Sequence, residues 1–248
     1  MVDALVIIPT YNERDNIEKV IHQIFSLPHH FHVLVIDDNS PDGTADKVRQ
    51  IMKHCPDQLH LETREGKKGL GTAYIHGFKW ALARNYQYVF EMDADLSHNP
   101  NDLMPLYEAC AKDGFDMAIG SRYIDGVNVV NWPLSRVLMS YLASIYVRII
   151  TGMPVRDTTA GFKCYKADTL RSINLDEIRF TGYAFQIEMK FAVWKLGYKI
   201  KEVSIVFTDR TEGESKMSTG IFREAVWGVI KLKWKSLVNP GKYKVGTP

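Results

Sequence analysis

Short apolar runs alternate with stretches of helical periodicity along the first 120 residues of the chain. The apolar runs predict strands at residues 4–9, 33–36, 59–62, 86–92 and 117–120. Apolar positions at helical spacing predict helices at 12–26, with Asn12 as the cap, and at 45–53, 69–84 and 103–112. Nearly continuous apolar strands between amphipathic helices are typical of a mainly parallel sheet that helices cover on both faces. The sequence therefore predicts an α/β fold.

Polar side chains follow three of these predicted strands at the point where each strand ends. They lie at residues 9–13, 37–38 and 93–95. In open α/β sheets, ligands bind outside the carboxyl ends of the strands. We therefore expect these three clusters, which are far apart in sequence, to meet at one edge of the sheet.

Asp93 and Asp95 flank Ala94, and Asp93 is the third residue after the apolar run 88–90. Hard cations prefer oxygen ligands, and Mg²⁺ typically takes one or two protein carboxylates together with phosphate oxygens of the substrate. The pair predicts a site that holds a divalent cation against a diphosphate, as in a nucleotide-sugar transferase. The alternative for an isolated Asp-x-Asp is a solvated acidic turn.

Composition narrows the class of protein. The 248 residues are enough for one large domain with a tail, and 46% hydrophobic and 24% charged residues are ordinary for a soluble globular protein. A net charge of +2 argues against a dedicated nucleic-acid binder. Cys55, Cys110 and Cys164 are far apart, which predicts no disulfide framework and a reducing compartment. The eight histidines show no metal-ligand spacing, and His98, the one near the proposed site, is expected to stabilise a turn.

Six motifs in order resemble those of the inverting family 2 glycosyltransferases, above all the polyprenol- or dolichol-phosphate mannosyltransferases. The resemblance covers about residues 4–220. It implies a GT-A (Rossmann-like) fold, a GDP-mannose donor, a polyprenyl-phosphate acceptor and a Mg²⁺ or Mn²⁺ cofactor. The motifs are Pro9-Thr10-Tyr11-Asn12-Glu13, Asp37-Asp38-Asn39-Ser40-Pro41-Asp42-Gly43-Thr44, Gly69-Leu70-Gly71-Thr72-Ala73-Tyr74, Asp93-Ala94-Asp95-Leu96-Ser97-His98, Gly120-Ser121-Arg122-Tyr123 and Gly213-Glu214-Ser215-Lys216. The segment Thr158-Thr159-Ala160-Gly161-Phe162-Lys163 also matches the polyprenyl-phosphate branch.

The resemblance also implies roles for single residues on the donor side. Asp95 is expected to bind the metal directly, and Asp93 to contact the ribose or a metal-bound water. Some relatives carry Gln where this chain has Ser97, and the shorter hydroxyl is expected to reach the ion only through water. The implied donor-binding residues are Pro9, Tyr11, Glu13, Ile36, Asp38, Asp93, Ala94, Asp95, Ser97, Arg122, Arg210 and Lys216.

On the acceptor side, the resemblance assigns the lipid phosphate to Arg122, Arg136 and Ser140. Arg136 and Ser140 are four residues apart on a predicted helix, so they share one face. An arginine offers two parallel donors to phosphate oxygens. Asp95 and Arg122 are the predicted catalytic residues. The Gly-containing segment 208–220 is expected to close over the diphosphate and exclude water.

A phosphate acceptor changes the chemistry that the site must perform. A phosphate monoester has its second pKa near 6, so it is already largely ionised at pH 7. We therefore expect no obligatory catalytic base. Positioning and electrostatics are expected to lower the barrier, and in-line displacement would give a β-linked mannosyl product.

Two apolar segments with interspersed cations predict contact with a membrane surface. They are 128–156 and the predicted amphipathic helix within 220–239. We divide the chain into a catalytic domain, 1–220, and a C-terminal helix and tail, 221–248. The longest uncharged stretch near the middle, 137–147, is too short to cross a bilayer, which needs roughly 20 residues. A peripheral protein at the cytoplasmic face is therefore expected, with an anchoring subunit as a further possible partner. The alternative for the C-terminal helix is ordinary packing on the sheet.

Two other functions fit the same residues. The first keeps the fold and the lipid phosphate but uses a UDP-sugar donor. The second is a non-catalytic subunit that binds nucleotide sugars. Retention of Asp93, Asp95, Arg122, Arg210 and Lys216 argues against the second, because a scaffold does not need that set of charges.

Overall fold

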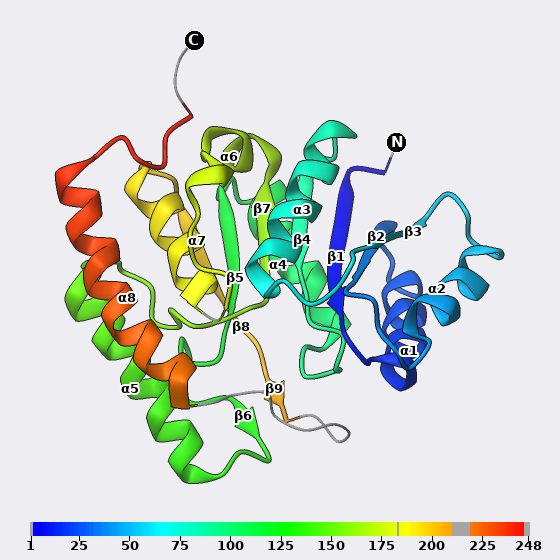
Figure 1. The fold of residues 1–248 in the computed structure, drawn as a ribbon, viewed down its shortest axis with the longest axis horizontal. Coiled ribbons are helices and arrows are strands. Elements are labelled where there is room, and N and C mark those ends of the chain that lie inside the picture. The colour runs from blue at the N-terminus through cyan, green and yellow to red at the C-terminus, as the bar shows by residue number, and fades with distance from the viewer. Residues whose placement is uncertain (1, 183, 210–218, 246–248) are drawn as a thin grey trace.

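A seven-stranded sheet forms the centre of the computed structural model, which describes residues 2–182, 184–209 and 219–245 (Figure 1). The strand order is β3-β2-β1-β4-β7-β5-β8. Only β7 runs antiparallel to its neighbours, so the mainly parallel sheet predicted from the sequence is confirmed. The strands are β1 (Ala4–Thr10), β2 (Phe31–Asp37), β3 (Leu59–Thr63), β4 (Tyr88–Glu91), β5 (Met117–Ser121), β7 (Lys163–Lys166) and β8 (Ile200–Ser204). A separate ribbon pairs β6 (Val129–Val130) with β9 (Phe207–Thr208).

Helices cover both faces of the sheet because successive strand residues alternate between two apolar cores. Leu5 and Ile7 of β1 belong to the core beneath α3 and α7, and Val6 and Ile8 belong to the core beneath α1 and α4. The α-helices are α1 (Arg14–Phe25), α2 (Thr44–Met52), α3 (Leu70–Ala83), α4 (Leu103–Ala111), α5 (Leu134–Thr151), α6 (Ala167–Ser172), α7 (Ala184–Lys195) and α8 (Thr219–Val238).

The first helix begins one residue later than predicted from the sequence, because Glu13 and not Asn12 is its N-cap. Asn12 has a φ of 60°, in the left-handed region, and its backbone N–H donates to Ser40 Oγ at 3.1 Å. Glu13 takes the capping position instead, and its carboxylate accepts a hydrogen bond from Asn16 Nδ2 at 3.1 Å. Asn12 therefore ties the end of β1 to the loop after β2 and does not cap α1.

Helix α5 is longer than the uncharged stretch that the sequence analysis considered. It has 18 residues, includes Arg136 and Arg148, and is 17% buried. By length and composition alone it is the one helix in the described part of the chain that could cross a membrane, which corrects the expectation drawn from 137–147.

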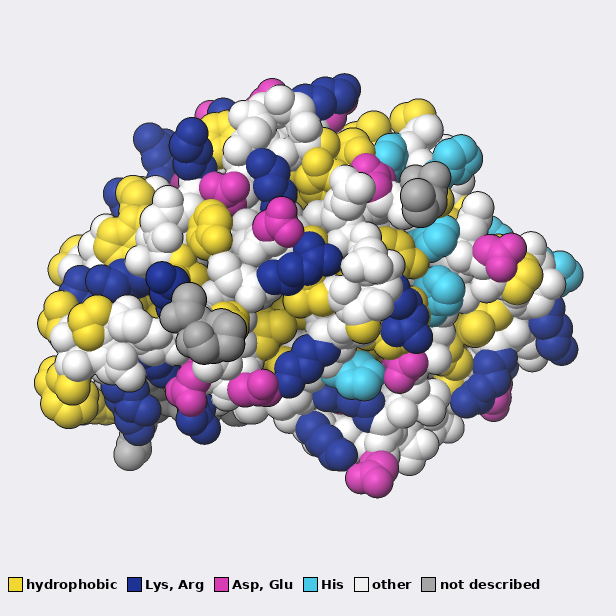
Figure 2. Space-filling view, turned by 90° about the horizontal axis from the view of Figure 1, so that it is seen from above, with side chains coloured by type: hydrophobic (Ala, Val, Ile, Leu, Met, Phe, Trp, Pro, Cys, Tyr) yellow, Lys and Arg dark blue, Asp and Glu magenta, His cyan; other side chains and the backbone are white. Residues whose placement is uncertain are grey.

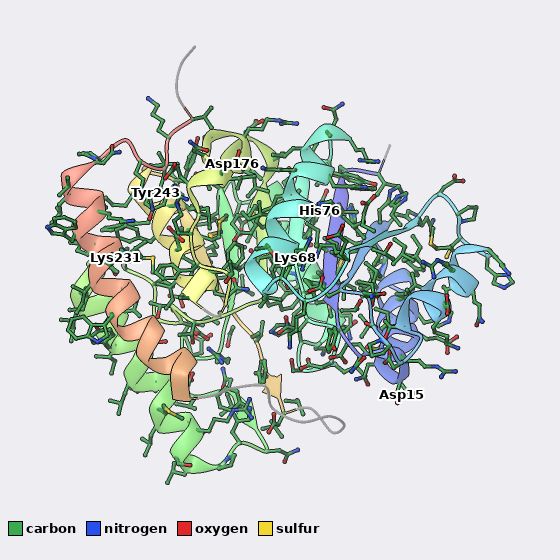
Figure 3. The ribbon with its side chains drawn as sticks, in the orientation of Figure 1. Asp15, Lys68, His76, Asp176, Lys231 and Tyr243 are labelled. Atoms are coloured by element: carbon green, nitrogen blue, oxygen red, sulfur yellow. The ribbon has the colours of Figure 1, made fainter. Side chains whose placement is uncertain are left out.

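The C-terminal helix packs on the domain along one face. In Figure 1, α8 runs beside α5 and α7. Val229 and Leu232 are buried in the same core as α3 and α7. Farther along, the Tyr243 hydroxyl donates to Glu188 Oε1 on α7 at 3.1 Å, and Figure 3 labels Tyr243 at this position. The opposite face of α8 exposes Trp227, Trp234 and Leu237. One face of α8 therefore packs on the domain, and the other exposes apolar side chains. The two alternatives considered for this helix are thus not exclusive.

Histidines gather on one side of the molecule when it is seen from above the orientation of Figure 1 (Figure 2). The His32 and His60 rings lie 5.7 Å apart in an edge-on arrangement. Burial lowers the pKa of both side chains, so they are neutral at pH 7.

Within 2–182, 184–209 and 219–245, no three His, Cys, Asp or Glu residues are grouped so that they could hold a metal ion.

Candidate functional site

Predicted residues from both the donor and the acceptor side line one cavity at the carboxyl ends of the strands. The cavity has a volume of about 730 Å³, within the size range of small-molecule sites. Apolar side chains of α5, including Leu138 and Leu142, form one wall. The predicted residues in the lining are Asp93, Asp95, Ser97, Arg122, Arg136 and Ser140.

A tight turn after β4 directs the two aspartates towards the cavity. Asp95 Oδ1 accepts hydrogen bonds from the Ser97 hydroxyl at 2.5 Å and the Ser97 backbone N–H at 3.1 Å. Leu96 has a φ of 60°, which reverses the chain at this point. The Asp93 side chain is 37% exposed, whereas Ser97 is buried. Ser97 therefore orients Asp95 through its hydroxyl.

The donor chemistry of this turn fits a divalent cation. Two carboxylates face the same cavity, and Mg²⁺ or Mn²⁺ prefers such hard oxygen ligands. Because the described residues hold no group of three ligands, the remaining coordination would come from water and a bound diphosphate. Asp95 and Asp93 are the residues that would hold the ion.

His98 stabilises the turn that carries Asp93 and Asp95, as predicted from the sequence. It is 3% exposed, and its ring stacks on Phe162 with the ring centroids 4.8 Å apart. Burial lowers the pKa of His98 to about 4, although the Asp95 charge opposes this shift. The ring is therefore neutral at pH 7, and its Nδ1 accepts a hydrogen bond from the Asp93 backbone N–H at 3.3 Å.

Arg122 lies at the end of β5 and is fixed by a buried carboxylate. Its Nε and Nη2 donate to the two oxygens of Asp157, each at 2.7 Å, and Nη2 also donates to Thr159 Oγ1 at 2.7 Å. Burial favours the neutral form of Asp157, but the guanidinium outweighs burial and keeps the pKa of Asp157 below its ordinary value. Arg122 therefore lines the cavity while it is paired with Asp157. The predicted role of Arg122 in binding phosphate did not include this ion pair.

The two predicted acceptor residues of α5 also have protein partners. Arg136 Nη1 lies 2.9 Å from both carboxylate oxygens of Asp209, and its guanidinium lies 4.1 Å from the centre of the Trp132 ring. Ser140 Oγ accepts a hydrogen bond from the Tyr123 hydroxyl at 2.8 Å. The structure thus places Arg136 and Ser140 on the cavity side of α5, as their spacing predicted.

The predicted nucleotide side lies at the ends of β1 and β2. Asp38 receives two hydrogen bonds from Arg64, at 2.6 and 2.8 Å, and Arg64 also donates to Thr72 on α3. Arg64 lines a second cavity, of about 410 Å³, next to the end of β2. Tyr11 lies beneath Lys67, whose Nζ is 5.0 Å from the ring centre. Arg64 was not predicted as a site residue, although it follows β3 as Asp38 follows β2.

Other predicted donor residues are placed in different ways. Ile36 is fully buried and Ala94 is 3% exposed, so a donor could reach them only through their main chains. Glu13 occupies the N-cap position of α1. Pro9 lies on β1, paired in register with Ile36. Arg210 and Lys216 lie outside the described residues.

A layer of buried charged side chains, which was not predicted, lies next to the turn of residues 93–97, here called the aspartate turn. Lys163 Nζ of β7 lies 2.9 Å from Glu91 Oε2 of β4, and both side chains are fully buried. Lys190 of α7 donates to the carbonyl oxygens of Thr158 and Ala160, at 3.0 and 2.6 Å. These contacts fix the segment before β7 against the cavity floor. The sequence pattern around Lys163 did not predict that its side chain is buried.

Comparison with known proteins finds relatives along most of the chain. Residues 5–173 match the family model described as glycosyl transferase family 2. An undecaprenyl-phosphate mannosyltransferase from Micrococcus luteus is 45% identical over 94% of this chain and 97% of its own length. A polyprenol monophosphomannose synthase from Mycolicibacterium smegmatis is 42% identical over 92% of this chain and 86% of its own.

A solved structure also resembles the fold. It is the mannosyltransferase PcManGT from Pyrobaculum calidifontis in complex with GDP-Man and Mn²⁺, with a TM-score of 0.58 and 18% sequence identity. The likeness covers 99% of this chain and 66% of that chain. At this level of identity the likeness concerns the fold, which is of the GT-A type as predicted.

Proposed function

Because the chain belongs to glycosyl transferase family 2, we propose that it transfers mannose from GDP-mannose to a polyprenyl phosphate such as dolichyl phosphate, with inversion and with Mg²⁺ or Mn²⁺. The names of the relatives from Micrococcus luteus and Mycolicibacterium smegmatis support the mannosyl and polyprenyl parts of this proposal. The GDP-Man and Mn²⁺ bound to PcManGT support the donor and the metal.

One observation carries the proposal. A single cavity combines the aspartates that fit a cation, the guanidinium groups of Arg122 and Arg136, and an apolar wall from α5. A molecule with an anionic head and a hydrocarbon tail matches this combination, because its head would meet the guanidinium groups while its tail lies along α5.

The residues can act without a general base. The lipid phosphate is largely ionised at pH 7, so one of its oxygens can attack the anomeric carbon without losing a proton first. The bond to the diphosphate breaks as the new bond forms, and the bonding pair leaves with GDP. The metal, when bound, would neutralise the charge that builds on the diphosphate. Arg122, held by Asp157, would orient phosphate oxygens within the cavity.

A ligand screen tests the donor. Thermal unfolding is measured with GDP, UDP and CDP, each with and without Mn²⁺. A ligand that binds the native state raises the unfolding temperature with the logarithm of its concentration. We expect the largest rise with GDP and Mn²⁺ together. A preference for UDP would favour a UDP-sugar transferase, and no response to any nucleotide would favour a non-catalytic subunit.

We propose a peripheral position at the cytoplasmic surface of a membrane, and the apolar faces of α5 and α8 support contact with a membrane surface. Large exposed side chains on these two helices include Leu134 at 72%, Ile149 at 75% and Trp227 at 67%. Lys231, labelled in Figure 3, is exposed on α8 one helical turn after Trp227. Apolar side chains beside cations are what an interfacial helix presents to anionic lipid.

A vesicle assay tests this position. We expect Trp234→Ser to weaken binding to anionic vesicles about tenfold, because the exposed indole would lose its place in the lipid. Lys231→Gln should weaken binding about fivefold at low salt, and the matched control Lys53→Gln on the far side of the sheet should not. The measurement is co-sedimentation at several salt concentrations. Vesicle binding that changes neither with salt concentration nor with either α8 substitution would contradict the proposal. An anchoring subunit would then be the route to the membrane.

A further inference from the structure

A buried amide forms part of the cavity floor. Gln186 is the third residue of α7, lines the cavity and is only 2% exposed. Its Oε1 accepts a hydrogen bond from the Lys163 ammonium. A lysine ammonium can only donate, so the amide oxygen must face Lys163 and the amide nitrogen must face away from it.

The neighbours of Lys163 hold this orientation in place. Lys163 is fully buried and pairs with Glu91, and Glu91 in turn accepts a hydrogen bond from the Tyr165 hydroxyl at 2.7 Å. Reversing the amide of Gln186 would bring its N–H groups against a buried ammonium. The orientation is therefore fixed before any substrate binds.

The amide nitrogen has no hydrogen-bond partner among the residues that the structure describes. Leaving a buried donor unpaired costs free energy, so such a group in a cavity points to a ligand. The space in front of it is open because residue 161 is glycine. A Cβ on Gly161 would lie 3.7 Å from Gln186 Nε2 and 3.8 Å from both Asp93 Oδ2 and His98 Cε1.

The surroundings favour an anionic oxygen as that ligand. The Lys163 ammonium behind the amide polarises it, which strengthens the hydrogen bond that its N–H can donate. Arg122 lines the same cavity, Lys190 donates to the carbonyl oxygen of Ala160 in its lining, and apolar side chains of α5 line it as well. A phosphate on a hydrocarbon chain fits these surroundings better than a neutral sugar hydroxyl does.

We propose that Gln186 Nε2 donates a hydrogen bond to an oxygen of the acceptor phosphate and orients it for attack beside Asp93. This assignment rests on the proposed function and adds a residue to it. An amide takes up no proton at neutral pH, which suits a nucleophile that is already ionised.

Gln186→Glu tests the assignment with little change in shape. The glutamate still accepts from Lys163, so the fold should persist, but it lacks the N–H and places a negative charge next to the phosphate. We expect the KM for polyprenyl phosphate to rise about tenfold to hundredfold, as for the loss of a hydrogen bond to a charged group. The Kd for GDP-mannose with Mn²⁺ should stay unchanged. Gln87→Glu, an equal charge change at an exposed position directly before β4, is the matched control and should leave both constants unchanged.

Gly161→Ala provides an independent variant. The added methyl group meets no atom closer than 3.7 Å, so the protein should fold, but the methyl group fills the space in front of the amide. We again expect a higher KM for polyprenyl phosphate with unchanged donor binding. An acceptor KM within twofold of wild type in both variants, or a weakened donor Kd in place of the acceptor effect, would overturn the assignment. Absence of mannosyl transfer by the wild-type protein would instead defeat the proposed function itself.

Discussion

Asp95→Ala should reduce kcat for mannosyl transfer by about a thousandfold, because the departing diphosphate would lose its metal-held charge stabilisation. The fold should survive, since Asp95 lies in a turn at the cavity, where it accepts hydrogen bonds from Ser97, two residues away. Turnover at saturating GDP-mannose and Mn²⁺ gives the rate, and circular dichroism reports the fold.

Asp113→Ala is the matched control for this substitution. Asp113 is an exposed aspartate in the turn after α4, and its loss should leave turnover unchanged. An Asp95→Ala protein that transfers mannose at nearly the normal rate would show that the aspartate turn does not hold the metal.

Asp157→Ala should lower the free energy of unfolding by about 3–5 kcal/mol, because it leaves the Arg122 guanidinium buried without its counter-charge. Activity should also fall, since Asp157 fixes the direction of Arg122. Urea unfolding at pH 7 measures the change. The control Asp168→Ala breaks a surface pair with Arg171, in which Asp168 is 92% exposed, and should cost less than about 1 kcal/mol. Equal losses in the two variants would contradict the structural role of the Arg122–Asp157 pair.

The same pair predicts a dependence on pH. Burial raises the pKa of Asp157, but Arg122 lowers it more, so the folded-state pKa lies below the ordinary value of 3.8. Below that value the unfolded chain binds more protons at this position than the folded one. The stabilisation is therefore fully present above about pH 4 and is lost as the pH falls through the folded-state pKa. The difference between wild type and Asp157→Ala should stay constant from pH 7 to 5 and shrink only in stronger acid.

The sheet was predictable where its strands are apolar, and less so elsewhere. β1, β2 and β4 are buried on both faces, so they appear as continuous apolar runs in the sequence. β7 reads Lys163-Cys164-Tyr165-Lys166, and nothing local shows that Lys163 is buried against Glu91. The burial of this lysine depends on a partner from another strand, which the sequence pattern does not reveal.

The residues that line the site were predictable from the sequence, but the partners that fix their side chains were not. Ligands bind at the carboxyl ends of strands in such sheets, and this rule predicted a site at Asp93 and Asp95. Both residues line the cavity that Arg122 also lines. The rule does not identify the partners that fix these side chains. Asp157 beside Arg122, Arg64 beside Asp38 and Lys163 beside Gln186 are all contacts between distant segments, and they appear only in the folded chain.

We propose that one cation, held by the aspartate turn, serves mannosyl transfer to a lipid phosphate in the adjoining cavity. The direct measurement incubates the wild-type protein with radiolabelled GDP-mannose and polyprenyl phosphate, with Mn²⁺ or with EDTA, and counts label in the organic phase. We predict a β-linked mannosyl lipid that forms with Mn²⁺ and not with EDTA. Transfer that proceeds equally well in EDTA, or label that never enters the lipid with Mn²⁺ present, would contradict the account.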